Sequence, residues 1–169
     1  MADVTLESAG PAHRRTLENL FQLYVHDFSE QWFDRELGEL EETGLFACCP
    51  DPEPYWIEPG RSAWLIRTGG KLAGFALVGR SSHSGQPCDH DMAEFFVARK
   101  YRRLGVGYAA ASRLIAERPG LWEIAVTRRN RGAQPFWRRV AADLATGAVL
   151  DCDQDDARWN GLILRFTVA

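Results

Sequence analysis

The sequence has no run of 18 or more apolar residues, so no segment is long enough to cross a membrane as a helix, and no membrane partner is expected. Residues 1–7 lack the basic and then apolar order of a signal peptide, and we therefore expect a cytoplasmic protein. Only four cysteines are present and none forms a Cys-x-x-Cys pair, so reduced thiols are expected rather than a disulfide framework. No repeat and no linker divides the 169 residues, which predicts a single domain over residues 1–169.

The charges are distributed unevenly, although the net charge of the chain is only −3. Residues 1–60 carry a net charge of −10, residues 61–139 carry +10 and residues 140–169 carry −3. A basic centre between acidic ends favours an anionic ligand bound centrally. Nucleic acid is not expected as a partner, because the whole chain is acidic and its basic residues do not form one tract.

The hydrophobic pattern predicts strands and helices in alternation. Apolar residues recur at helical spacing over residues 13–29, and a second, acidic helix is expected over residues 32–40. The proline-rich residues 47–60 predict a long loop. The other expected elements are helices at 106–118 and 134–144 and strands at 4–8, 62–67, 72–78, 91–97, 121–127 and 161–168. This order predicts an α/β or α+β domain, with a mixed sheet covered by helices on both faces.

Two groups of potential metal ligands are incomplete. Residues 151–156 resemble the start of a calcium loop, but Asp156 and Leu162 stand where that loop requires glycine and glutamate. A solvated hairpin loop is expected there instead. His83, Cys88 and His90 lack an evident fourth zinc ligand, so no metal is expected.

The segment richest in chemical signals is the turn Arg102-Arg103-Leu104-Gly105-Val106-Gly107, where a predicted strand leads into a predicted helix. Its glycines allow a ligand to approach the backbone, and the free N–H groups of the first helical turn favour a phosphate or pyrophosphate. Arg102 and Arg103 add positive charge. A tight turn with solvated arginines explains the same residues without any ligand.

Two phosphate-binding motifs can be compared with this turn. A P-loop is absent, because no Gly-x-x-x-x-Gly-Lys-Ser/Thr run exists. The dinucleotide motif fits Gly105-x-Gly107-x-x-Ala110, but the acidic ribose partner expected about 20 residues later is replaced by residues 127–129, Thr-Arg-Arg. An NADP-binding domain is therefore the less favoured alternative.

The segment Met92–Ala111 resembles the acyl-CoA-binding core of the GCN5-related N-acetyltransferase (GNAT) superfamily. The family signature Gln/Arg-x-x-Gly-x-Gly/Ala is matched by Arg102-x-x-Gly105-x-Gly107. The segment Trp122–Trp137 is similar to the strand that follows in the family and to its Asn-x-x-Ala-x-x-Phe/Tyr helix start, here Asn130-x-x-Ala133-x-x-Phe136. The resemblance implies a GNAT-like acyltransferase fold with a mixed, mostly antiparallel central sheet.

The resemblance also implies acetyl-CoA as the acyl donor. The backbone from Phe95 to Ala98 would pair with the pantetheine arm, the N–H groups from Arg102 to Tyr108 would hold the pyrophosphate, and an N–H near Val97 would polarise the acyl carbonyl. The residues expected to bind the donor are Phe95, Phe96, Val97, Arg102, Arg103, Leu104, Gly105, Val106, Gly107, Tyr108, Asn130 and Phe136.

The reaction implied is direct attack of a primary amine on the thioester in a ternary complex. Glu94 is the expected catalytic base, because several relatives carry a carboxylate at this place on the strand. It is expected to share a face with Met92 and Phe96, whose apolar surroundings would raise its pKa. A glutamate paired with an arginine is an equal alternative, and His90 and Asp91 are secondary candidates for the base.

The sequence departs from the family at the general acid. Many relatives have a tyrosine in the helix after the asparagine motif, whereas this chain has Phe136 and Trp137. Tyr108 and Ser112 are candidate replacements, and the missing tyrosine leaves a non-catalytic acyl-CoA-binding module as an alternative. The acceptor is expected to be a small-molecule or peptide amine that enters over the acidic residues 1–60. A monomer or homodimer is expected.

Several aromatic residues lie in the part of the chain where this family forms its acceptor pocket. Core packing accounts for most of them, and Trp56, beside the proline-rich loop, is the strongest candidate for contact with an acceptor. The set is Tyr24, Trp32, Phe33, Tyr55 and Trp56.

Overall fold

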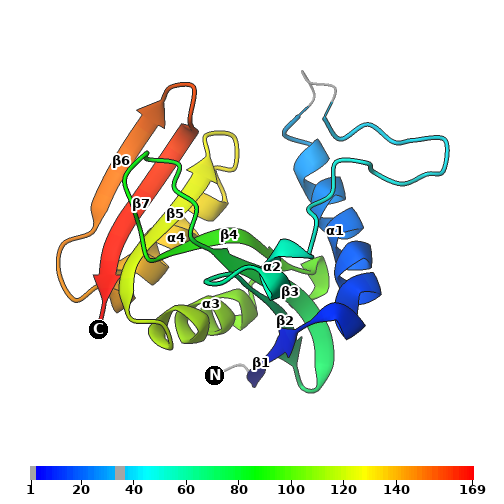
Figure 1. The fold of residues 1–169 in the computed structure, drawn as a ribbon, viewed down its shortest axis with the longest axis horizontal. Helices are drawn as coiled ribbons and strands as arrows, with labels where there is room; N and C mark the ends of the chain where they lie inside the picture. The colour runs from blue at the N-terminus through cyan, green and yellow to red at the C-terminus, as the bar shows by residue number, and fades with distance from the viewer. Residues whose placement is uncertain (1–2, 33–36) are drawn as a thin grey trace.

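A computed structural model describes residues 3–32 and 37–169 as one seven-stranded sheet with helices on both faces (Figure 1). The strand order is β1-β2-β3-β4-β5-β7-β6, and among the described strands β4 and β5 alone run parallel. The predicted mixed, mostly antiparallel sheet is thus confirmed, and a doubly wound parallel sheet for NADP is excluded. The strands are β1 Val4–Ala9, β2 Ser62–Thr68, β3 Lys71–Gly79, β4 His90–Val97, β5 Gly120–Thr127, β6 Leu150–Asp155 and β7 Asn160–Val168.

The helices cover the two faces of the sheet in pairs. One face carries α1 (Arg14–Ser29) and the single-turn α2 (Pro54–Ile57), and the other carries α3 (Val106–Ala116) and α4 (Ala133–Leu144). Helix α1 forms where predicted, because its apolar residues recur on one side and pack against β3.

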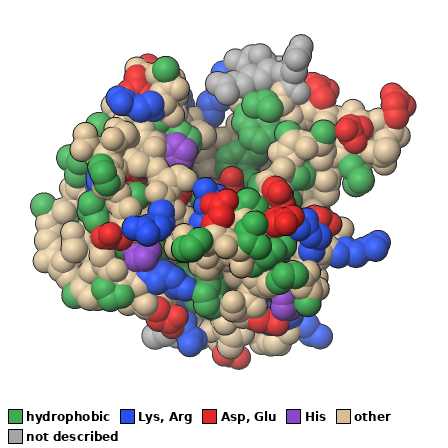
Figure 2. Space-filling view, viewed as in Figure 1, with side chains coloured by type: hydrophobic (Ala, Val, Ile, Leu, Met, Phe, Trp, Pro, Cys, Tyr) green, Lys and Arg blue, Asp and Glu red, His purple; other side chains and the backbone are tan. Residues whose placement is uncertain are grey.

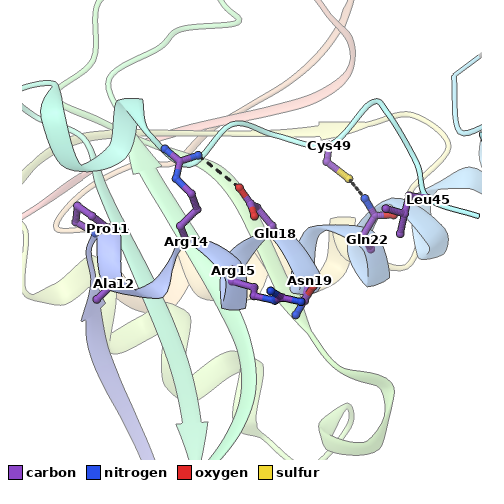
Figure 3. Close-up of a pocket in the computed structure, with 9 residues that line it drawn as sticks. All are labelled: Pro11, Ala12, Arg14, Arg15, Glu18, Asn19, Gln22, Leu45 and Cys49. Atoms are coloured by element: carbon purple, nitrogen blue, oxygen red, sulfur yellow. Dashed lines mark hydrogen bonds and ion pairs between the residues drawn. The ribbon is translucent and has the colours of Figure 1, made fainter. Parts of the chain in front are cut away.

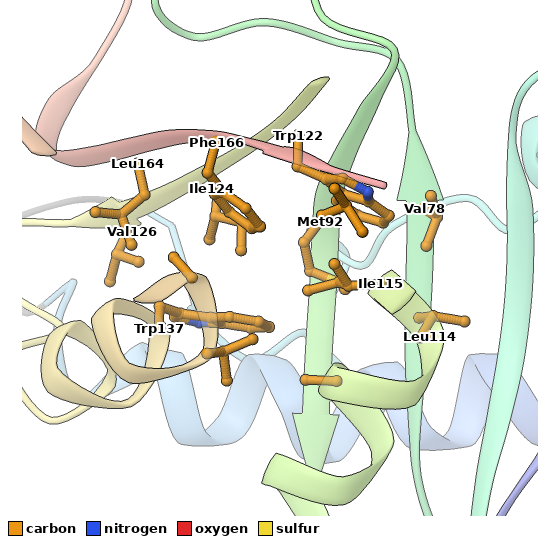
Figure 4. Packing of buried hydrophobic residues seen from close by; sticks show 14 of the residues in the cluster. Val78, Met92, Leu114, Ile115, Trp122, Ile124, Val126, Trp137, Leu164 and Phe166 are labelled. Carbon is orange, nitrogen blue, oxygen red and sulfur yellow. The ribbon is translucent and has the colours of Figure 1, made fainter. Parts of the chain in front are cut away.

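The larger core cluster joins α3 and α4 to the sheet (Figure 4). Trp122 of β5 and Leu114 of α3 are fully buried, and Trp137 of α4 is 7% exposed. Burial of each such side chain contributes about 1.5–3 kcal/mol, which fixes both helices against the sheet. The N-termini of α3 and α4 are thereby held on the same face.

The sheet opens between β4 and β5. Their pairing is confined to His90↔Trp122 and Asp91↔Glu123, so among the described residues the two strands separate after Asp91. Figure 1 shows the β5–β7–β6 half turning away from the β1–β4 half. The side of β4 that faces this opening therefore presents backbone N–H and C=O groups without a strand partner.

A β-bulge at Ala93 sets the direction of the side chains on β4. Leu77 pairs with Glu94 and Val78 pairs with Met92, which leaves Ala93 as the extra residue. Met92 consequently packs in the α3–α4 cluster, whereas Phe96 packs on the α1 side, where Glu94 meets Tyr24 of α1. The expectation that Glu94 shares a face with Met92 is wrong, because the extra residue breaks the simple alternation.

Two expectations for the N-terminal third are also contradicted at the positions that the structure describes. Residues 33–36 of the expected acidic helix lie outside the described residues, and residues 37–44 form turns with a single bridge between Leu40 and Phe46. Leu37 and Leu40 are 46% and 61% exposed, so at these two positions no core surface supports the expected helix. The expected loop over 47–60 contains α2, which starts at Pro54, whose fixed φ suits a first helical turn.

The expected hairpin loop over residues 151–156 is instead mostly strand β6. β6 is an edge strand, and its aspartates form ion pairs with arginines of other elements, which the local sequence does not reveal. The Arg138 guanidinium lies 2.6 Å from Asp151, and that of Arg128 lies 2.8 Å from Asp153.

Candidate active site

Glu94 is half-buried beside the opening, on the face of the sheet covered by α1. The Tyr24 hydroxyl of α1 donates a short hydrogen bond to its Oε2 atom. Burial raises the pKa of Glu94 to about 7, the Tyr24 hydrogen bond opposes this, and the nearby charge of Asp91 raises the pKa further. A carboxyl with this pKa can accept a proton at neutral pH.

Further acidic groups surround Glu94. Asp91 is 3% exposed and accepts a hydrogen bond of 2.9 Å from the Ser81 N–H, and burial raises its pKa to about 6. The pKa of Tyr55 rises to about 12 through burial and the charges of Glu94 and Asp91. The site thus gathers two carboxyls and two phenols, Tyr24 and Tyr55, in a poorly hydrated environment.

His90 lies away from this group. Its Nε2 atom is 3.1 Å from the Pro119 carbonyl oxygen, and its ring centroid is 5.0 Å from that of Trp122 in the α3–α4 core cluster. The structure therefore brings Asp91, but not His90, into the surroundings of Glu94.

The turn Arg102–Gly107 presents free backbone donors at the N-terminus of α3. Arg103 and Gly105 have φ values of 60° and 81°, so the chain turns twice through the left-handed region. Within the described parts of the chain, the N–H groups from Arg103 to Tyr108 donate to no backbone carbonyl. Such a concave set of N–H groups at the positive end of a helix dipole favours a phosphate anion.

Apolar residues from the end of β4, the start of α3 and the start of α4 lie close together, and we call this group the apolar track. A Cβ atom added to Gly107 would lie 3.6 Å from Val97 Cγ2 and 3.7 Å from Phe136 Cε2. Phe136 in turn stacks on Phe95 at a centroid distance of 6.1 Å. Phe95, Val97, Gly107 and Phe136, each expected to bind the acyl donor, are therefore brought together at the opening.

The two arginines of the turn have different surroundings. Arg102 forms a short ion pair with Asp27 of α1 and donates a 2.6 Å hydrogen bond to the Val97 carbonyl, and Arg99 also bonds to Asp27 at 2.9 Å. Burial opposes the ionisation of Asp27, but these hydrogen bonds outweigh it and lower its pKa. Arg103 is exposed and forms no ion pair within the described residues. Arg102 thus anchors the turn to α1, and Arg103 is the guanidinium left to an anion.

The remaining candidates occupy the flanks of the track. Asn130 is half-buried in the turn between β5 and α4, and its carbonyl accepts the Ala133 N–H at 3.1 Å. The Tyr108 hydroxyl donates to Asp143 of α4 at 2.7 Å, and Ser112 Oγ is buried without a hydrogen-bond partner among the described residues. The Tyr108 proton is therefore directed toward α4, away from Glu94's face of the sheet.

Tyr24 and Asp27 are site residues that the sequence did not assign to these roles. Their partners, Glu94 and Arg102, lie 70 and 75 positions away in the chain. The helical spacing of α1 predicts only that Tyr24 faces the core.

Three other features were candidates for a functional site or a membrane segment: a cavity beside α1, groups of possible metal ligands, and long apolar helices. A cavity of about 640 Å³ is lined by Pro11 and Ala12 before α1, by α1 itself and by Leu45 and Cys49 after it, rather than by β4 or the turn before α3 (Figure 3). No group of three His, Cys, Asp or Glu residues able to hold a metal ion occurs in residues 3–32 and 37–169. The helices of these same ranges include none that is long and apolar enough to span a membrane.

The sequence profile of the acetyltransferase (GNAT) family matches residues 17–141, about three quarters of the chain. The chain belongs to this family. No curated protein sequence matches this GNAT protein.

Solved structures share the fold of this GNAT protein at low sequence identity. An acetyltransferase from Thermus thermophilus has a TM-score of 0.66 and 15% identity, covering 99% of this chain and 100% of the other. A GNAT-family acetyltransferase from Staphylococcus aureus has a TM-score of 0.62 and 13% identity, covering 98% and 99%. A Bacillus subtilis acetyltransferase in complex with CoA has a TM-score of 0.50 and 10% identity, covering 100% of both chains.

Proposed function

We propose that this GNAT protein transfers an acetyl group from acetyl-CoA to a primary amine. The observation that carries the proposal is the opening between β4 and β5, which has a cradle of free N–H groups on one face and Glu94 on the other. The CoA complex of the Bacillus subtilis relative supports the choice of donor.

The residues of the opening fit the parts of the donor. The N–H groups from Arg103 to Tyr108 would hold the pyrophosphate, with Arg103 as the available cation. The backbone of β4 from Phe95 to the Val97 N–H has no partner among the described strands on this side and would bond to the pantetheine amides, and the side chains of Phe136 and Val97 would enclose the arm. The N–H group near Val97 would stabilise the negative charge that develops on the acyl oxygen.

Acetyl-CoA supplies an activated thioester to this site. Glu94 accepts one proton of the incoming ammonium, so that the neutral amine nitrogen attacks the thioester carbon and forms the C–N bond. The C–S bond then breaks, the thiolate leaves, and the nitrogen releases its second proton to solvent, which gives a neutral amide. Neither Phe136 nor Trp137 carries a proton for the sulfur. Since a thiol has a pKa near 8.5, the thiolate leaves without obligatory protonation and then takes a proton from solvent.

The test combines calorimetric titration with acetyl-CoA and an assay of free-thiol release with primary amines. We expect the wild-type protein to bind acetyl-CoA and release thiol, and Glu94→Gln to retain the affinity while losing at least 100-fold in kcat. Absence of acetyl-CoA binding would overturn the proposal.

The Tm of Glu94→Gln shows whether a loss of activity in this variant comes from a loss of folding. Above pH 7 the wild-type protein must ionise a buried carboxyl, whereas glutamine remains neutral, so Glu94→Gln should have an equal or higher Tm at pH 8. Binding of acetyl-CoA without thiol release by the wild-type protein, across the whole amine series, would instead favour a non-catalytic acyl-CoA-binding module.

A further inference from the structure

Three aromatic side chains follow one another from the site along α1 and the turn after it. Tyr24, Phe28 and Trp32 are spaced four residues apart, with ring centroids 4.7 Å apart for the first pair and 5.8 Å for the second. Tyr24 packs against the core, but Phe28 and Trp32 are half-buried and belong to neither side of the described core. Both residues therefore keep part of their surface exposed, on the stretch of chain that continues from Tyr24, the partner of Glu94.

The position of these rings is fixed by the structure around them. Gly38 approaches Trp32 so closely that an added Cβ atom would lie 3.0 Å from Trp32 Cε3. Gln31, next to Trp32, lies 3.4 Å from Thr127 Oγ1 at the end of β5, so the end of α1 reaches across the β4–β5 opening. Figure 2 shows a hollow between the α1 half and the β5–β7 half, with hydrophobic side chains along its α1 side.

The charges along this wall disfavour a polycationic ligand. Asp27, the carboxylate between Tyr24 and Phe28, is already paired with Arg99 and Arg102. Beyond Glu94, therefore, a ligand meets the aromatic rings of Phe28 and Trp32, and a second ammonium group would find no free carboxylate on the described part of this wall.

The spacing limits the length of the ligand. Phe28 lies four residues, about 6 Å along the helix axis, beyond Tyr24, whose hydroxyl donates a hydrogen bond to the Glu94 carboxylate. A chain of two or three carbon atoms spans that distance between an amine and the start of an apolar group.

We infer that the acceptor is a primary amine joined by two or three carbon atoms to an aromatic or similarly bulky apolar group. Its amine lies at Glu94, and its apolar group packs on Phe28 and Trp32, where offset or edge-to-face ring contacts add to the burial of apolar surface. This inference rests on the proposed acyl transfer and names the substrate class of that same site.

The experiment compares 2-phenylethylamine with 1,4-diaminobutane, a pair of similar length that differs in the aromatic ring and the second charge. With acetyl-CoA at pH 8, we expect kcat/KM from thiol release to be at least tenfold higher for 2-phenylethylamine. Phe28→Ala should raise the KM for 2-phenylethylamine about tenfold while kcat and the acetyl-CoA affinity are retained. Leu23→Ala is the matched control, because Leu23 is 52% exposed on the same helix, and it should change neither constant.

Two results would overturn the inference: equal or better use of 1,4-diaminobutane, or an unchanged KM for 2-phenylethylamine in Phe28→Ala. Failure of the proposed function gives a different result, namely loss of acetyl-CoA binding in calorimetry. In that case the two amines are titrated directly into the protein, and binding of 2-phenylethylamine that is no tighter than that of 1,4-diaminobutane overturns the inference independently.

Discussion

The ionisation of Glu94 is set by opposing contributions from individual residues. Burial raises its pKa to about 7, and the hydrogen bond from Tyr24 favours the carboxylate and so lowers the pKa. Only the carboxylate can accept the ammonium proton. A rate that depends on Glu94 should therefore rise as the pH increases through about 7.

Tyr24→Phe removes the hydrogen bond and leaves the aromatic ring in place. A hydrogen bond to a charged group contributes about 1.5–3 kcal/mol, and one pKa unit corresponds to about 1.4 kcal/mol. We therefore expect the acidic limb of the pH profile of kcat/KM to move upward by about one pH unit, with lower activity at pH 7. The measurement is thiol release between pH 5.5 and 9 at saturating acetyl-CoA.

Tyr55→Phe is the matched control for this shift. Its hydroxyl is close enough to feel the charge of Glu94, but the hydrogen bond to the carboxylate comes from Tyr24. The profile of Tyr55→Phe should therefore move much less. Equal shifts in the two variants would show that general polarity, rather than the Tyr24 hydrogen bond, sets the pKa of Glu94.

Among the elements, those that follow a local pattern were predictable from the sequence. Helix α1, the β2–β3 hairpin and the glycine turn before α3 each depend on residues close together in the chain. The bulge at Ala93 was not predictable, because it arises from the register of β4 against β3, and one extra residue reverses the face of every side chain beyond it. Strand β6 was missed for a related reason, since its aspartates are stabilised by arginines from other elements.

The same limit applies to the candidate site. The sequence placed Glu94 on a strand beside the glycine turn, and the resemblance to the GNAT superfamily supplied its expected role. The hydrogen bond from Tyr24 joins α1 to β4, and the ion pair of Asp27 with Arg102 joins α1 to the turn before α3, across 70 and 75 positions of the chain. Local spacing contains no information about such contacts.

The turn before α3 contains two glycines, and the structure requires glycine at each for a different reason. We therefore expect alanine at one position to weaken donor binding and alanine at the other to lower stability. Gly107→Ala adds a methyl group at ordinary contact distance from Val97 and Phe136, so the fold should tolerate it while the track narrows. We expect a Tm within about 2 °C of wild type and a Kd for acetyl-CoA that is about tenfold higher, measured by calorimetry.

For Gly105→Ala we expect the reverse, a loss of stability with little loss of acetyl-CoA affinity. No atom lies within 4 Å of the added Cβ, but the φ of 81° strains an L-residue by about 1–2 kcal/mol. The Tm should fall by about 3–6 °C at this chain length, with a smaller change in Kd than in Gly107→Ala. The opposite assignment of affinity and stability effects would contradict this account of the turn.

In the molecule as a whole, the two halves of the sheet meet at a pivot formed by Asp91 and Glu123. Glu123 is 1% exposed and pairs closely with Arg165 of β7. It also accepts hydrogen bonds from the loop between β3 and β4, at 2.6 Å from both the Ser84 hydroxyl and the His83 N–H. The carboxylate of Glu123 therefore joins β7 to the loop between β3 and β4, while the backbone of Glu123 pairs with Asp91 across the two halves.

Burial alone would raise the pKa of Glu123, but the hydrogen bonds from Ser84, His83 and Arg165 lower it overall. A pKa that is lower in the folded state stabilises the fold above the unfolded pKa of about 4.3, and this stabilisation is lost as the pH falls through the folded value. Glu123→Gln leaves Arg165 buried without its counter-charge, which costs about 3–5 kcal/mol. At pH 7 we expect the Tm to fall by about 10 °C, and the difference from wild type should shrink steadily below pH 4.

Asp153→Asn, which breaks the exposed ion pair with Arg128, should lower the Tm by less than about 3 °C at either pH. Equal Tm losses in the two variants, or a Glu123→Gln effect independent of pH, would show that the charge of Glu123 does not hold the pivot together.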